Sequence, residues 1–143
     1  VSNVNAQSPM AGMSPPEFKA EKAAGITTYD YDEVIKKLKV KEKERKTNVS
    51  EALKIYNSQM DDLAFNHSST FQSLEAEFNS NLQIAMQNRD RSQMNGVRAK
   101  IQEIIPPIRK EAIAEKEKLN TVMKEILTEK QNEKWLKYQN RMN

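Results

Sequence analysis

The chain lacks cysteine, and it contains only one histidine, His67. The first absence excludes disulfide bonds, thiolate metal sites and cysteine nucleophiles. The sequence also has no glycine-rich phosphate loop, so nothing in it brings together groups for acid–base or nucleophilic catalysis. We therefore expect a protein that is not an enzyme and that needs no cofactor.

Glycine, proline and aromatic residues are also scarce. Only three glycines and five prolines occur in 143 residues, and most of them fall in the first 25 positions, so the remainder has few turn signals. Hydrophobic residues make up 37% and aromatic residues 6%, which is little material for a globular core and suits an elongated helical protein. No apolar run approaches the roughly 20 residues that cross a bilayer, so we expect no membrane insertion.

Charge of one sign does not dominate any part of the chain. The 23 basic and 20 acidic residues are interspersed, which is typical of solvated helices. The most basic stretch, residues 36–46, contains two glutamates and no aromatic residue on which a base could stack. Nucleic acid is therefore not an expected partner.

Residues 1–28 are predicted to be a flexible leader, because this stretch contains Ser-Pro and Pro-Pro pairs and has no sustained helical spacing of apolar residues. Val4 and Ala6 have the spacing of a signal-peptidase site, with cleavage before Gln7. This predicts export to the periplasm; the alternative is an arbitrary start of the sequence.

Residues 29–143 are predicted to form a single helical domain. Asp30 or Asp32 can cap a short first helix that carries Val34, Ile35 and Leu38. Beyond it, apolar residues recur at intervals of three or four, which predicts one long helical stripe with a bend, not a reversal, near residues 66–69. That stripe comprises Val49, Leu53, Tyr56, Met60, Leu63, His67, Phe71, Leu74, Phe78, Leu82 and Ala85.

The polar residues 88–91 interrupt the pattern, and we expect the chain to turn back there. A second stripe follows, and Pro106-Pro107 is expected to kink or break it into two segments, because two amide donors are lost. The returning stripe comprises Met94, Val97, Ile101, Ile104 or Ile105, Ile108, Ala112, Leu119, Val122 or Met123, and Ile126.

The two limbs have equal length. Val40 and Tyr138 each lie 49 residues from Arg89, so the pattern predicts an all-α fold: a long bent antiparallel helical hairpin with a short helix at each end. Straight limbs would reach about 70 Å at 1.5 Å per residue. Either a second copy or the two short helices must cover the remaining apolar stripe, and we expect a homodimer.

Leu127-Thr128-Glu129-Lys130-Gln131 precedes the last predicted helix, which carries Trp135 and Tyr138. Thr128 and Gln131 have the spacing of a capping box. Leu-Thr-x-x-Gln is also the motif of the Spy/CpxP family of periplasmic helical proteins, which this chain resembles over about residues 30–138. A second motif copy would fall at residues 38–43, where neither Thr nor Gln stands in the required position.

The resemblance implies a cradle-like periplasmic dimer that binds unfolded or stress-damaged proteins without ATP, or an envelope-stress regulator. We expect Leu127, Thr128, Gln131 and Trp135 to shape a helix junction. Candidates for a client-binding surface are methionines, whose flexible side chains suit either such a surface or a core: Met60, Met86, Met94 and Met123.

Two other functions remain open from the sequence. One is a structural or partner-binding helical module. The other is metal sensing, in which His67 would join a carboxylate such as Asp61 or Asp62, although one imidazole with exposed acids makes a poor transition-metal site.

Overall fold

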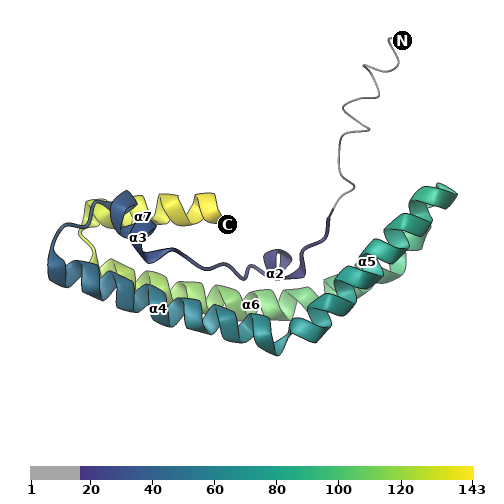
Figure 1. Cartoon of the computed structure of the whole chain (residues 1–143), viewed down its shortest axis with the longest axis horizontal. Helices are drawn as coiled ribbons and strands as arrows, with labels where there is room; N and C mark the ends of the chain where they lie inside the picture. The colour runs from purple at the N-terminus through teal and green to yellow at the C-terminus, as the bar shows by residue number, and fades with distance from the viewer. Residues whose placement is uncertain (1–16) are drawn as a thin grey trace, which may run out of the picture.

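The computed structural model describes residues 17–143, and all regular structure in this range is helical, as the sequence predicts. The elements are, in chain order, α2 (Ala20–Ala23), α3 (Tyr31–Leu38), α4 (Lys43–Asn66), α5 (Ser68–Asn88), the 3-10 helix η1 (Arg91–Met94), α6 (Asn95–Ile126) and α7 (Glu129–Met142). Helices α4 and α5 form the outgoing limb of a bent hairpin and α6 forms the returning limb (Figure 1).

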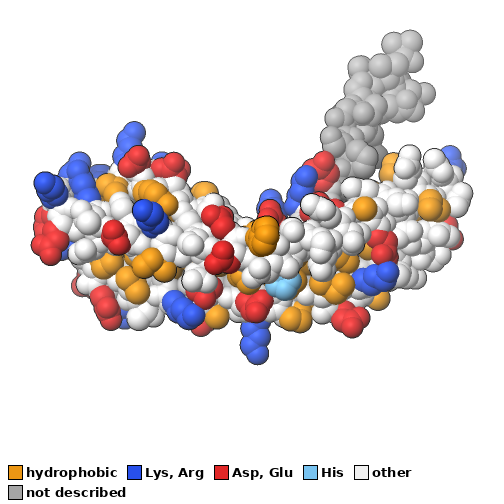
Figure 2. Space-filling view, turned by 60° about the horizontal axis from the view of Figure 1, so that its bottom comes forward, with side chains coloured by type: hydrophobic (Ala, Val, Ile, Leu, Met, Phe, Trp, Pro, Cys, Tyr) orange, Lys and Arg blue, Asp and Glu red, His pale blue; other side chains and the backbone are white. Residues whose placement is uncertain are grey.

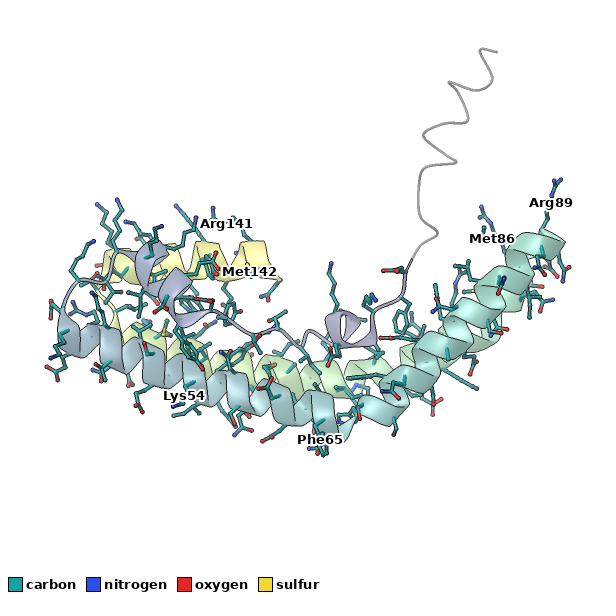
Figure 3. All side chains as sticks on the ribbon, in the orientation of Figure 1. Lys54, Phe65, Met86, Arg89, Arg141 and Met142 are labelled. Carbon is teal, nitrogen blue, oxygen red and sulfur yellow. The ribbon has the colours of Figure 1, made fainter. Side chains whose placement is uncertain are left out.

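The chain reverses at the predicted place. Helix α5 ends at Asn88 because Arg89 adopts the left-handed conformation, with φ of 53°. The Asp90 carboxylate then accepts hydrogen bonds from the backbone N–H and the hydroxyl of Ser92, at 3.0 and 2.6 Å, and so caps η1. These bonds from Ser92 hold the pKa of the Asp90 carboxyl below its ordinary value. Arg89 lies at the tip of the hairpin (Figure 3).

The outgoing limb bends at His67, as predicted. This residue leaves helical geometry, with φ of −109° and ψ of 10°. Its N–H still donates to the Leu63 carbonyl at 3.2 Å, and its own carbonyl accepts from the Phe71 N–H at 2.9 Å. These two bonds join His67 to the end of α4 and to the start of α5, and the limb changes direction here without reversing, so the junction is a bend. Figure 1 shows both limbs changing direction together.

The prediction of a kink or break at Pro106-Pro107 is wrong in its second form, since the returning limb is not broken into two helices, although it changes direction with the outgoing limb (Figure 1). Helix α6 runs unbroken through both prolines. Both proline rings are exposed, while Ile105 and Ile108 on either side of them are buried against Phe71 of α5. We attribute the continuity to this packing, which holds the helix where the lost amide donors would otherwise end it.

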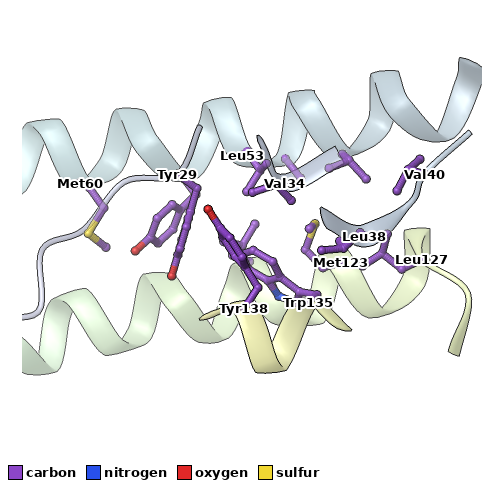
Figure 4. Close-up of a cluster of buried hydrophobic side chains, with 14 of the residues drawn as sticks. Tyr29, Val34, Leu38, Val40, Leu53, Met60, Met123, Leu127, Trp135 and Tyr138 are labelled. Carbon is purple, nitrogen blue, oxygen red and sulfur yellow. The ribbon is translucent and has the colours of Figure 1, made fainter. Parts of the chain in front are cut away.

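The main core lies where α3 and α7 pack onto α4 and α6, on the inner side of the bent hairpin (Figure 4). Trp135 is fully buried there, its ring 5.1 Å from that of Tyr29 in an edge-on arrangement, and its Nε1–H donates to Asn120 Oδ1 at 2.9 Å. Val40 and Tyr138 belong to the same cluster, which confirms that the two ends of the pattern meet.

This packing removes the physical reason for expecting a dimer. The sequence allowed either a second copy or the two short helices to cover the inner stripe, and α3 and α7 cover it within one chain. The homodimer stays a prediction.

The helical domain begins earlier than the predicted boundary at residue 29. Ala20 and Ala24 are fully buried, in a cluster that α2 forms with α5 and α6. The N–H of Ala20 also donates to Glu75 Oε2 at 2.9 Å. An alanine-rich turn this short has no periodicity of its own, so only its tertiary contacts reveal it. Residues 1–16 of the predicted leader, with the cleavage site before Gln7, lie outside the described residues.

We expect stability to fall steeply above about pH 10, because the core buries three tyrosines. Burial raises the pKa of Tyr29, Tyr56 and Tyr138 above the ordinary value of 10.0. The unfolded chain therefore releases these protons first, so the stabilising contribution is complete below pH 10.0 and is lost as the pH rises through the folded pKa values. Thermal unfolding followed by circular dichroism from about pH 8 to 11.5 measures this loss.

Tyr56→Phe should flatten that decline, whereas Tyr31→Phe, at a partly exposed position on α3, should leave it unchanged. A melting temperature of the unmodified chain that stays constant up to about pH 11 would contradict the expectation.

Candidate binding surface

The motif residues build the junction between α6 and α7. Thr128 Oγ1 accepts from the Gln131 N–H at 3.1 Å, and Gln131 Oε1 accepts from the Thr128 N–H at 3.1 Å, so the predicted capping box is present. The Gln131 amide also donates to the Lys39 carbonyl at 3.4 Å, at the end of α3. Leu127 and Trp135 are buried. These four side chains therefore stabilise the junction between the helices.

Three of the four candidate methionines lie in the core. Met60, Met94 and Met123 are buried, so the expected client surface built from four methionines does not form. Their helical phase places them on the stripes that face the interior, where flexible methionine side chains fill gaps between helices. Met86 alone is exposed, by 60%, near the tip of the hairpin (Figure 3).

His67 lies between the limbs at the bend. Its Nε2 is 3.6 Å from Glu111 Oε2, and its ring packs against Phe71. Asp61 and Asp62 are exposed. Within residues 17–143 no three His, Cys, Asp or Glu side chains come together in a way that would hold a metal ion.

Two exposed apolar residues on α4 were not among the sequence-based candidates. Phe65 is 80% exposed and Ile55 is 64% exposed. Phe65 lies at the outer side of the bend (Figure 3). Both are out of phase with the buried positions Leu53, Tyr56 and Met60, and this departure from the stripe is the sequence signal that could have found them.

A succession of four hollows follows the seam between α4–α5 and α6, and we call this the outer groove. It lies on the side of the hairpin away from α2, α3 and α7, which all pack on the inner side (Figure 1). The largest hollows measure about 450 and 360 Å³. Apolar side chains contribute to its lining at successive levels: Ile55, Leu63, Leu74, Ile104, Leu119 and Val122.

The rims of the outer groove are predominantly acidic, and its three bases are already paired. Lys100 bonds Glu77 at 2.8 Å, Lys118 bonds Glu115 at 3.0 Å, and Arg45 bonds Glu42 at 2.8 Å. Figure 2 shows acidic, basic and apolar side chains interspersed on this face of the molecule. Four further acids at the groove make no ion pair with any residue in the described range: Glu44, Asp62, Glu103 and Glu125.

Glu111 is a fifth acid at the groove, and its one ionic neighbour within the described range is His67. The groove therefore carries excess negative charge in a chain whose formal net charge is +3. Acidic and basic residues are interspersed along the sequence, and only the fold brings these acidic residues together along one seam.

No helix in the described part of the chain is long and apolar enough to cross a membrane. Comparisons of this chain with protein-family models, with curated proteins and with solved structures find no match. The resemblance to the Spy/CpxP family therefore rests on the Leu127–Gln131 motif and on the order of the helices.

Proposed function

We propose that this chain is a non-enzymatic binding protein of the cell envelope that holds unfolded or damaged polypeptides without ATP. The observation that carries this proposal is the outer groove, whose lining includes apolar side chains of both limbs, among them the exposed Ile55 (64%) and Val122 (41%). Single exposed apolar residues are ordinary, but exposed ones from two helices that line the same hollow are typical of a surface that meets another molecule.

The helical architecture is the second support. The chain has a short lead-in helix, a long outgoing limb, a tight turn, a returning limb and a motif-capped last helix, which is the arrangement that the Spy/CpxP resemblance implies. The envelope location and the homodimer derive from that resemblance and are parts of the proposal. Sedimentation velocity of the purified chain tests the dimer directly.

An aggregation assay tests the proposed function. A chemically denatured client is diluted into buffer without ATP, and light scattering follows its aggregation. We expect the chain to suppress scattering at a near-stoichiometric ratio. Ile55→Ser combined with Phe65→Ser should weaken suppression several-fold, because both residues are exposed apolar side chains on α4.

Leu136→Ser is the control, since Leu136 is also an exposed apolar residue, by 42%, but belongs to α7, on the inner side of the hairpin. This variant should suppress aggregation as well as the unmodified chain does. Circular dichroism verifies that all variants remain helical. If the unmodified chain does not suppress aggregation, the chaperone proposal fails and the partner-binding module is the better description.

A further inference from the structure

The inner and outer sides of the hairpin differ in how completely they are covered. On the inner side, α3 and α7 add a further layer and bury the main core. On the outer side, no element within residues 17–143 covers the seam between α4 and α6. Two packed helices with an open groove between them accept a third helix readily, because side chains of the third helix fit between those of the pair.

The charge on the rims decides which kind of helix fits. The bases of the groove are neutralised by the pairs Lys118–Glu115 and Arg45–Glu42, while Glu44, Asp62 and Glu125 remain available on both limbs. An acidic or neutral segment would leave these carboxylates uncompensated, and an anionic lipid or nucleic-acid surface would be repelled. Lys and Arg side chains flanking an apolar face would meet them from both sides.

We propose that the half of the outer groove between α4 and the second half of α6 docks a basic amphipathic helix of another protein. The inference builds on the proposed function, because it names the partner class for the same surface. The apolar face of the partner would lie on the exposed Ile55 and Val122, above the buried Ala52 and Leu119 at the floor of the hollow, and its basic residues would meet the acidic rims.

The bend fixes the length of the partner helix. A straight helix can follow the seam only from the open end of the hairpin, at Glu125, to the bend, at Glu111. That interval spans about 21 Å at 1.5 Å per residue, so a helix of about 14–16 residues fills it. A longer helix would have to kink at the level of His67.

The probe for this site is a fluorescein-labelled 16-residue helical peptide, with leucines at intervals of three and four and lysines flanking them. Fluorescence anisotropy measures its binding to the full chain. We expect the lysine peptide to bind at least about tenfold more tightly than the same peptide with glutamates in place of the lysines, and several-fold more weakly when salt rises from about 50 to 500 mM. A peptide that keeps the lysines but replaces the leucines with serines should also bind weakly.

The test variant is Asp62→Asn with Glu111→Gln, which removes two charges from the groove rims. The matched control is Glu21→Gln with Glu133→Gln, which removes two exposed charges from α2 and α7 on the inner side. Because both double variants have the same net charge, a general electrostatic attraction would weaken equally in the two. We expect a loss of at least about fivefold for the groove variant and less than twofold for the control.

Equal losses in the two variants would overturn the inference, and so would equal affinity for the lysine and glutamate peptides. A dimer that the groove variant dissociates would overturn it too, since a second copy would then be the occupant. The two proposals fail separately. Peptide binding without aggregation suppression would contradict the chaperone function and support the docking site. Suppression of aggregation without any preference for the lysine peptide would support the chaperone function and contradict the docking site.

Discussion

Replacing Trp135 with alanine is expected to destabilise the protein by about 3–5 kcal/mol, the largest effect of any single substitution considered for this chain. The indole is fully buried beside Tyr29, in the segment before α3, and Tyr138, on α7, and its loss leaves a cavity that these rings cannot fill by small movements. Domains of this size are stable by about 5–15 kcal/mol, so the variant would lose a large share of its stability. Chemical denaturation followed by circular dichroism measures the change.

Two further variants separate packing from hydrogen bonding at the same place. Trp135→Phe keeps an aromatic ring but removes the donor to Asn120 Oδ1, so it should cost less than the alanine variant. Leu136→Ala, one residue along and partly exposed, should change the free energy of unfolding by less than about 1 kcal/mol. If Trp135→Ala were no worse than Leu136→Ala, α7 would not be docked on the hairpin in solution.

Much of the fold was predictable because local chemistry and helical period agree over long stretches. The apolar stripe from Val49 to Ala85 determines which side of the outgoing limb faces α6. Because the helical period repeats over many turns, the assignment of this side is hardly ambiguous. The cap at Asp30 and the box of Thr128 and Gln131 involve residues only three apart, so their geometry is local and readable.

The errors arose where tertiary contacts overrule local preference. Pro106-Pro107 locally opposes a helix, but burial of Ile105 and Ile108 on both sides keeps α6 continuous. Helix α2 has only four residues, too few for any period, and its order depends on burying Ala20 against α5 and α6. Neither effect can be seen in a window of sequence.

The candidate surface was harder to predict than the fold. Met60, Met94 and Met123 were candidates because of their flexible side chains, but their helical spacing places them on the inward-facing stripes, and they are buried. The outer groove depends instead on residues of α4 and α6 that lie 45 or more positions apart, as Asn66 and Glu111 do, and meet only after the chain turns at Arg89. Ile55, which breaks the phase of the stripe and lines the groove, was the available hint.

Replacing Leu53 with alanine is expected to destabilise the protein by about 2–5 kcal/mol. Leu53 is fully buried in the main core, on the face of α4 that meets α3 and α6. Its truncation removes apolar contacts to several helices at once and leaves a cavity at the centre of the bundle. Urea denaturation with an unchanged slope would attribute the loss to the native state.

Ile55→Ala is the matched control for this substitution, because it truncates another branched aliphatic side chain on the same helix, only two positions away. Ile55 is 64% exposed in the outer groove, so the free energy of unfolding should change by about 0.5 kcal/mol or less. Under the proposed function this variant should still weaken client holding, which separates the stabilising face of α4 from its binding face. Equal destabilisation by the two variants would mean that Ile55 is covered in solution, and a second copy packed on the outer groove would then be the first explanation to test by sedimentation.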